Sequence, residues 1–335
     1  MAGVEFYSGI LCAGFVNTHS HLELAYLRGA IEEGGGFASF ASSIGRVRNN
    51  FSEEEQLTAI AEADKEMWQE GVDAVGDIVN GVTSFATKAT SKIYYHNFAE
   101  VFGLRECNLE RQRKLLNYPN TTLSPHSTYS VQDAPFCEVC GEGEAPLSIH
   151  FLETPDEKLL YKGEGSLNEW YKAVGFECDF LHYGGPAERI VACTPKQRSV
   201  VLVHNCALAE QDIEVIENHF SSVYWALCPR SNYYISAIEP QSVELLRARA
   251  LNICIGTDSL ASNRSLSIIE ELKMFPDVPL AERLQWATIN GAKALGIADK
   301  FGSIEVGKQS GIVNLTGVDL DDFTLTQASK AVRIL

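Results

Sequence analysis

The sequence has no long hydrophobic run and few basic residues. No stretch approaches the about eighteen uncharged apolar residues that cross a membrane, and residues 1–9 lack the basic region and apolar core of a signal peptide. Lysine and arginine number 27 against 44 aspartates and glutamates, so the formal net charge is −17. Because nucleic acids and anionic lipids bind basic patches, neither is an expected partner. We therefore expect a cytoplasmic protein that binds neither nucleic acid nor membrane.

The sequence also lacks a regular cysteine pattern. Its nine cysteines are odd in number and scattered, unlike those of a disulfide framework. Cys137 and Cys140 form the only closely spaced pair. Without a second pair, a zinc or redox motif is the weaker interpretation. We expect the cysteines to be small buried side chains in a reducing compartment.

What the sequence does contain is an alternation of short apolar runs and amphipathic segments. Hydrophobic residues make up 45% of the 335 residues, which is enough for a sizeable core. The alternation is typical of α/β domains with parallel strands. Eight runs fit strands, the number that a closed (β/α)8 barrel of the TIM type needs: Ile10–Asn17, Ala74–Val79, Ile93–Val101, Thr121–Ser124, Leu147–Phe151, Val200–Val203, Val223–Leu227 and Leu251–Ile255.

Two of the predicted helices carry clear end signals. Ser52 precedes Glu53–Glu55 in a capping box, and Gly71 ends the amphipathic segment that follows. Pro279 stands where a first helical residue is favoured and opens a helix over Leu280–Leu295. The first helix fits between two predicted barrel strands, and the second follows the last predicted strand.

The alternation of predicted strands and helices ends beyond Gly302. Ser303–Lys308 and Ile312–Leu315 predict a hairpin with Gly307 at its turn, followed by an irregular acidic tail. We therefore expect a barrel over residues 10–302. Residues 1–9 and 303–335 would form a separate small β subdomain.

Histidines gather at the ends of the predicted strands. Five of the eight lie at or just after the C-terminal end of a strand, where parallel α/β barrels place their active sites: His19, His21, His126, His150 and His204. Asp258 ends the last predicted strand. Histidines that only pack in the core are not expected to gather at that edge.

The triplet His19-Ser20-His21 is the sharpest of these features. Side chains two apart on a strand point to the same side, so both imidazoles can share one metal. The triplet alone is weak support for a metal site, but its place after an apolar run strengthens it. His150 at another strand end can add a nitrogen, and Asp258 can complete a shell that leaves room for water.

Glu153 follows His150 by three residues. On a loop above a metal it could move a proton without binding the ion. Taken in isolation, the tetrapeptide favours a simpler interpretation, a surface glutamate after a buried histidine.

Two motifs carry a resemblance to a known family. Gly14–His21 resembles the opening motif of the amidohydrolase superfamily, and Gly256–Asp258 its closing motif. The chain is similar to the branch with S-adenosylhomocysteine, methylthioadenosine, aminofutalosine and guanine deaminases and triazine chlorohydrolases. The resemblance runs over residues 9–315. It implies a TIM-type barrel with a small β-sandwich appendage. Only residues 1–9 precede the first strand, so the expectation is either a trimmed appendage or a sequence that omits a segment.

The resemblance also implies a mononuclear metal site with four ligands: His19, His21, His150 and Asp258. Zinc suits this shell and iron is the alternative, because such ligands discriminate weakly between the two metals. His204 would hold and help to deprotonate the attacking water. Glu153 would deliver the proton to the substrate ring, and Asp258 would help to manage the remaining protons. Thr121–His126 lacks the lysine that is carboxylated in binuclear members.

Substrate contacts are implied by two further segments. Ser124–Ser130 resembles a family segment whose histidine faces the substrate, so His126 is expected to contact it, the alternative being a histidine packed under a loop. Cys228–Asn232 resembles a motif near the substrate, where Arg230 would meet a polar or anionic substituent or else pair with a local acid. Family members often contact the substrate through three further positions, which here are Glu23, Tyr26 and Glu100. A paired or solvated side chain is the simpler interpretation of each.

The combined motifs predict hydrolytic deamination of an adenosine-like or related purine compound, with release of ammonia from a cyclic amidine. Guanine deaminases and triazine-type chlorohydrolases are alternatives with the same site. A non-catalytic barrel would lack a ligand or the proton shuttle, and neither is missing. A dinucleotide-binding oxidoreductase needs a glycine-rich turn after the first strand, whereas Gly34–Gly36 follows none. The expected partner is a small molecule, and any assembly is expected to be a homodimer.

Overall fold

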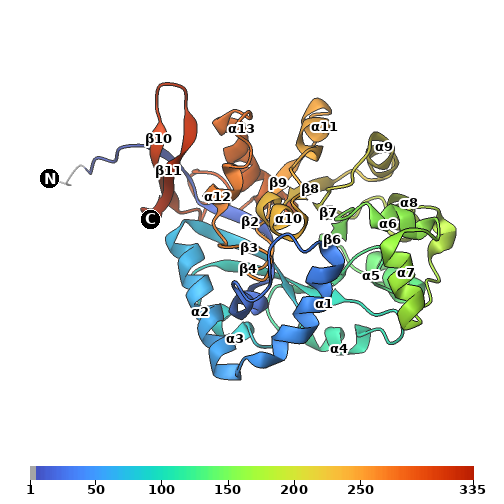
Figure 1. The fold of residues 1–335 in the computed structure, drawn as a ribbon. Helices are drawn as coiled ribbons and strands as arrows, with labels where there is room; N and C mark the ends of the chain where they lie inside the picture. The colour runs from blue at the N-terminus through green and yellow to red at the C-terminus, as the bar shows by residue number, and fades with distance from the viewer. Residues whose placement is uncertain (1–4) are drawn as a thin grey trace.

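Eight parallel strands form the centre of the molecule (Figure 1). The structure, a computed structural model, describes residues 5–335, so residues 1–4 of the predicted β subdomain lie outside it. The strands form two parallel sheets, ordered β2-β3-β4-β5 and β6-β7-β8-β9. Their bounds are β2 Phe15–Ser20, β3 Val72–Val79, β4 Tyr94–Val101, β5 Thr121–Pro125, β6 Leu147–Phe151, β7 Val200–His204, β8 Val223–Leu227 and β9 Ile253–Ile255.

The two sheets meet along both edges. At one seam, Ser20 pairs in parallel with Asp258, whose backbone N–H donates to the His19 carbonyl at 3.1 Å. At the other, the His150 N–H donates to the His126 carbonyl at 2.9 Å. The predicted (β/α)8 barrel of the TIM type is confirmed. Both seams run through residues that the sequence marked as site candidates.

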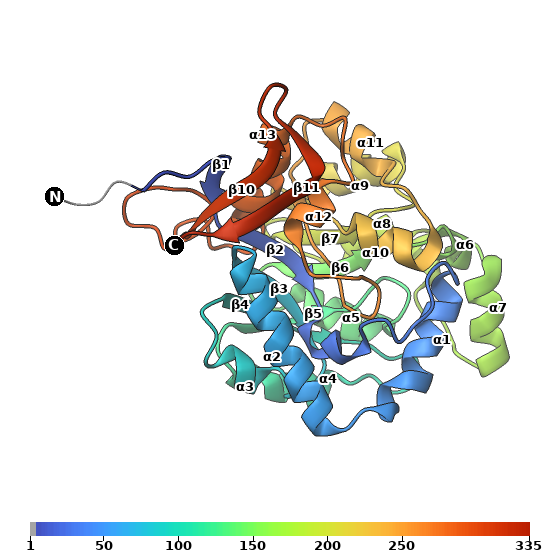
Figure 2. The ribbon, with the colours of Figure 1, turned by 60° about the vertical axis from the view of Figure 1, so that its left-hand side comes forward.

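Helices surround the barrel (Figures 1 and 2). Ser52 caps the second helix with the predicted capping box, which is confirmed. No helix among residues 5–335 is long and apolar enough to cross a membrane. The helices are α1 Phe37–Val47, α2 Glu53–Gln69, α3 Phe85–Lys88, α4 Leu109–Arg113, α5 Asp133–Gly141, α6 Asp156–Tyr161, α7 Gly165–Val174, α8 Pro186–Cys193, α9 Glu210–His219, α10 Pro229–Ser236, α11 Ser242–Ala248, α12 Ile268–Leu272, α13 Leu280–Gln285 and α14 Gly291–Ala294.

Short helical turns complete the connections. Four are 3₁₀ turns, η1 Leu22–Leu27, η2 Arg48–Asn50, η3 Lys114–Asn117 and η4 Leu181–Tyr183. The π-helical segment η5, Trp286–Asn290, joins α13 to α14, so the helix predicted over Leu280–Leu295 is present as one continuous helical run.

The first predicted strand is divided in two. Ile10–Ala13 forms β1, and β2 starts at Phe15. Gly14 lies between them against Asp73, where a Cβ atom would come within 2.0 Å of the carboxylate. Only glycine fits this close approach, and the chain changes sheet there.

β1 belongs to a small antiparallel sheet with β10 (Ile312–Asp319) and β11 (Thr324–Arg333), beside the barrel (Figure 2). The hairpin predicted around Gly307 is wrong, and so is the irregular tail, because Ile312–Leu315 pairs with β1 and with the tail itself. Asp322 accepts the N–H of Thr324, so acidic residues build the β10–β11 turn. The division into two domains at residue 302 stays a prediction.

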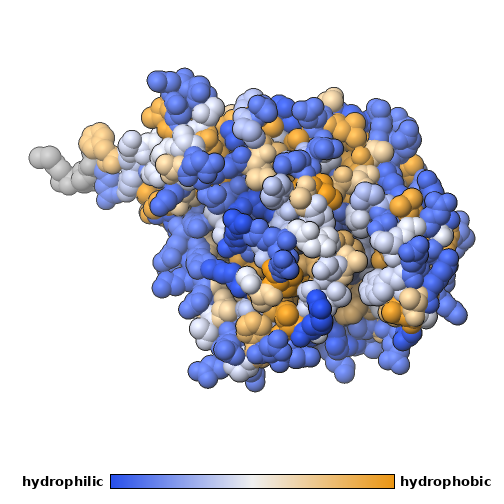
Figure 3. Space-filling model, viewed as in Figure 1, coloured by the Kyte–Doolittle hydropathy of each residue, from blue (hydrophilic) through white to orange (hydrophobic). Residues whose placement is uncertain are grey.

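Alternate positions of each strand pack into different clusters. In β3, Val75 and Val79 belong to the large apolar cluster between strands and helices. Ala74 and Ile78 lie in a second cluster with Leu295 beyond α14. Figure 3 shows mainly hydrophilic residues on the face seen in Figure 1, in keeping with the net charge of −17.

Candidate active site

One pocket of about 300 Å³ opens at the C-terminal ends of the barrel strands. Six of the sequence-marked side chains line it: His21, His126, His150, Glu153, His204 and Asp258. His19 lies fully buried beside them, its ring centroid 5.0 Å from that of His21. The structure therefore brings together side chains from β2, β6 and β7 and from the loops that follow β5, β6 and β9.

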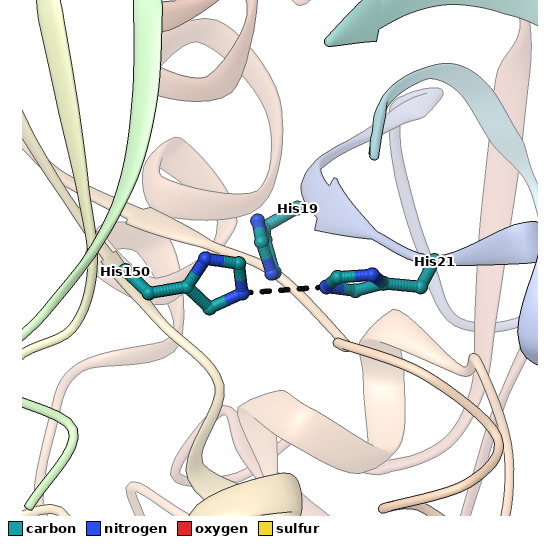
Figure 4. Close-up of side chains that lie close together, drawn as sticks. All are labelled: His19, His21 and His150. Atoms are coloured by element: carbon teal, nitrogen blue, oxygen red, sulfur yellow. Dashed lines mark hydrogen bonds between the residues drawn. The ribbon is translucent and has the colours of Figure 1, made fainter. Parts of the chain in front are cut away.

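Three imidazoles and one carboxylate point at a common centre. His21 Nε2 lies 3.3 Å from His150 Nε2 and 3.4 Å from Asp258 Oδ1. His19 Nε2 is 3.9 Å from the same Asp258 oxygen and is buried without a hydrogen-bond partner. Figure 4 shows His21 and His150 facing each other, with a ring nitrogen of His19 close to both. One atom from each of these three histidines lies within 4.8 Å of the others.

These distances fit a metal centre. A tetrahedral ion with metal–nitrogen bonds of about 2.0–2.1 Å holds its ligand atoms about 3.3–3.4 Å apart. His150 donates Nδ1–H to the His126 carbonyl at 2.9 Å, which leaves Nε2 as a lone-pair donor toward the centre. A cation at the same centre would give the orphaned His19 nitrogen a partner.

The ionisation of these groups suits a cation. Burial and neighbouring imidazoles lower the pKa of His150 to about 4, and burial lowers that of His21 to about 3, so both rings are neutral at pH 7. Burial alone would raise the pKa of Asp258, but the facing imidazoles and the Ser231 hydroxyl lower it to about 2. Neutral imidazoles with one carboxylate are the form in which these residues bind metal.

A second pair of groups stands beside this centre. His204 Nδ1 donates to Asn232 Oδ1 at 2.9 Å, so its buried Nε2 is free to accept a proton. That nitrogen lies 3.8 Å from Glu153 Oε1. Burial raises the pKa of Glu153 to about 7 and lowers that of His204. A carboxyl group that titrates near neutral pH and an imidazole with a free nitrogen therefore face the same space.

Three residues at this end of the barrel have a strained backbone. Leu152, His204 and Asp258 have φ of 50°, 78° and 56°, in the left-handed region that non-glycine residues rarely adopt. Such residues persist where surrounding contacts hold them, and they cluster at functional sites. No residue type in the sequence signals these conformations.

The motif around Arg230 contributes to the site through its other members. Ser231 donates to Asp258 Oδ2 at 2.6 Å, and Asn232 orients His204. Arg230 is absent from the pocket lining and donates to Ser265 at 2.8 Å. Its predicted substrate contact stays a prediction. Both residues belong to the segment Cys228–Asn232, so the resemblance of that segment to a motif near the substrate could have signalled their roles.

The remaining sequence candidates lie around the pocket. His126 lines it and pairs through Nδ1 with Ser130 at 2.7 Å. Glu100 is buried, accepts from Asn80 at 2.8 Å and approaches His150 Nδ1 at 3.9 Å. Glu23 accepts the backbone N–H groups that follow β3. Glu23 and Glu100 are therefore hydrogen-bonded within the protein, which agrees with their interpretation as paired side chains.

Sequence reasoning missed the outer half of the pocket. Large apolar side chains from α1, α7 and nearby segments form this part of the lining: Leu24, Phe37, Phe40, Ile44, Phe102, Leu104, Trp170, Tyr171 and Phe176. Among residues 5–335, no lysine or arginine lines the pocket. Aromatic residues are common in hydrophobic cores, so their spacing in the sequence does not predict that these side chains line a pocket.

The expectation that all cysteines are free is wrong. Cys137 on α5 forms a disulfide with Cys193 on α8, with Cα atoms 4.5 Å apart. Cys140, its CxxC neighbour, is buried and free, and the six remaining cysteines are also free, although four of them are only half-buried. The two bonded residues are 56 positions apart, and packing of α5 against α8 brings them together, so their spacing carried no signal.

Comparison with known proteins adds an independent finding. The model of the amidohydrolase family matches residues 10–332. A 5-methylthioadenosine/S-adenosylhomocysteine deaminase from Teredinibacter turnerae is 27% identical over 344 residues, covering 93% of this chain and 73% of that protein. An adenosine deaminase from Helicobacter pylori is 27% identical over 335 residues, covering 91% and 78%. The crystal structure of Helicobacter pylori aminofutalosine deaminase with methylthio-coformycin has a TM-score of 0.79 at 26% identity, covering 92% and 80%.

Proposed function

The chain belongs to the amidohydrolase family, and we propose that it is a metal-dependent hydrolytic deaminase of an adenosine-like purine compound. It is a hydrolase of carbon–nitrogen bonds other than peptide bonds. The observation that carries the proposal is the convergence of His19, His21, His150 and Asp258 on one centre beside Glu153. The names of its relatives, which are deaminases of adenosine-type compounds, support the substrate class.

The four converging side chains would hold one divalent cation, zinc by preference with iron as the alternative. When bound, such a cation lowers the pKa of a coordinated water from about 16 toward about 7, which supplies hydroxide at neutral pH. All other chemistry falls to the chain's own residues.

Glu153 and His204 would move the protons. Ionised Glu153 takes a proton from the attacking water and delivers it to the ring nitrogen next to the amine-bearing carbon. His204 orients the water through its free Nε2, and Asp258 accepts a hydrogen bond from it. The water oxygen bonds to the ring carbon, its second proton passes by way of Asp258 to the amine nitrogen, the carbon–nitrogen bond breaks, and ammonia leaves.

The outer pocket supports a more specific substrate. Its apolar wall would cover a hydrophobic substituent on the sugar, away from the reacting ring. Relatives are named for 5-methylthioadenosine and 5'-deoxyadenosine, compounds with apolar groups at that position. We propose that such 5'-substituted adenosines are preferred over adenosine.

A substrate panel tests the function. Metal-loaded enzyme should release ammonia from adenosine-type compounds, with a mass gain of about one unit in the product. Glu153→Gln should lose turnover while keeping its metal. Turnover of guanine or of a chlorinated triazine in place of adenosines would contradict the proposal, and so would full activity of Glu153→Gln.

A further inference from the structure

Glu157 is a buried carboxylate that the chemistry described above does not use. It lies on α6, four residues after Glu153, and its side chain is fully buried. Within residues 5–335 it forms no ion pair with lysine, arginine or histidine. A buried acid without a counter-ion is costly unless its oxygens accept hydrogen bonds.

Both oxygens of Glu157 accept hydrogen bonds from the segment that carries Glu153. Oε1 accepts the backbone N–H of Glu153 at 2.7 Å, and Oε2 accepts that of Leu152 at 3.0 Å. Leu152 has a φ of 50°. The carboxylate therefore holds in place a conformation that leucine does not favour by itself.

Glu157 also contacts the neighbouring loop that follows β5. The Thr128 hydroxyl donates to Oε2 at 3.5 Å. The neighbouring Tyr129 lines the pocket and donates its hydroxyl to Glu153 Oε2 at 3.4 Å. One carboxylate thus joins the loop after β5 to the loop after β6.

We propose that Glu157 is a positioning residue for proton transfer: it fixes the backbone at Leu152 and Glu153 so that the Glu153 carboxylate faces His204 and the reacting ring. The inference rests on the proposed function, because it assigns Glu153 the proton. Burial and the nearby Glu153 raise the pKa of Glu157, whereas the backbone N–H groups of Glu153 and Leu152 lower it and so favour its ionised form.

Glu157→Gln tests this role. The amide keeps one acceptor oxygen, and its NH₂ group faces the second backbone N–H, so the segment loses one of its two restraints. We expect kcat to fall about 10- to 100-fold, with KM within about twofold of wild type. Metal content should stay at the wild-type level. The matched control is Glu169→Gln on α7, an exposed glutamate that should leave kcat unchanged.

A double-mutant cycle separates positioning from a general structural defect. In a cycle with Glu153→Gln, the double variant should be as slow as Glu153→Gln alone, because Glu157 acts only through Glu153. Because these variants are slow, their rates are measured by mass spectrometry of the product that forms over long incubations.

Several outcomes would overturn the positioning role. Wild-type kcat in Glu157→Gln, or losses that multiply in the double variant, would each reject it and leave the proposed function standing. A wild-type enzyme that is inactive on the whole panel rejects both. If Glu157→Gln does not fold, Glu157→Asp takes its place, because it keeps the charge but is one methylene too short to hold both N–H groups.

Discussion

At the scale of single residues, the site depends on hydrogen bonds that orient each functional group. Asp258 is held by the hydroxyls of Ser231 and Ser262 at 2.6 and 2.8 Å, which leaves Oδ1 toward the histidines. His150 and His204 are each fixed through Nδ1. These contacts decide which atom faces the centre, and they lead to two predictions.

Removal of the Ser231 hydroxyl should weaken metal binding. Ser231→Ala leaves Asp258 Oδ2 with one hydrogen bond fewer, and loss of such an orienting partner costs about 10- to 100-fold in metal affinity. Competition with a chelator of known affinity measures the effect. Tyr233→Phe, at an exposed position on the same helix α10, is the control. Unchanged affinity in Ser231→Ala would show that Ser262 alone orients the carboxylate.

The pH dependence of the reaction should report Glu153. Burial raises its pKa to about 7, and the ionised form is needed to take the water proton. As pH falls through about 7, the carboxyl becomes protonated and kcat/KM should decline with a slope of one proton. The profile measured from pH 5 to 9 tests this, and activity constant from pH 7 down to pH 5 would contradict it.

At the scale of elements, α1 and α7 turn a barrel end into a selective pocket. They contribute Phe37, Phe40, Trp170 and Tyr171 to the outer wall. Neither helix belongs to the repeating strand–helix unit that builds the barrel. Substrate preference can therefore change through these helices without any change to the metal-binding side chains.

Trp170→Ala should reduce the preference for apolar substituents. Trp170 is 43% exposed, so its truncation should not unfold α7, but it removes apolar surface from the pocket wall. We expect kcat/KM for a 5'-alkylthio adenosine to fall about tenfold, with the value for adenosine nearly unchanged. Tyr233→Ala, an exposed aromatic outside the pocket lining, is the control. Equal losses on both substrates would contradict a role for Trp170 in substituent binding.

At the scale of the whole molecule, the site lies where the two halves of the barrel meet. His19 and His21 come from the first sheet and its edge, His150 from the second, and Asp258 from the seam between them. A cation bound there would link both halves. Metal binding should therefore stabilise the entire barrel as well as support catalysis.

Removal of the metal should lower the free energy of unfolding. A ligand that binds only the folded state adds about 4 kcal/mol when present at about a thousand times its dissociation constant. Urea unfolding before and after chelation, and after zinc is restored, measures the difference. The same unfolding midpoint in all three conditions would contradict a cation that links the two sheets.

Local patterns predicted much of this protein. Periodicity and end signals were enough for the eight strands and for the helix capped by Ser52, because these depend on neighbouring residues. The C-terminal hairpin was misplaced because its strands pair with β1, hundreds of residues away. Polar residues at strand ends pointed to His150 and Asp258, since parallel strands must present their ends at one edge.

The sequence by itself determined the barrel, the edge at which the site lies, and the residue types available there. Only the tertiary structure decided which side chains meet: the hydroxyl of Ser231 on Asp258, the carboxylate of Glu157 beneath Glu153, the aromatic wall, and the Cys137–Cys193 pair. The reason is physical. Strand and helix patterns arise from contacts a few residues apart, whereas these encounters depend on closure of the barrel and on backbone conformations that no single residue favours.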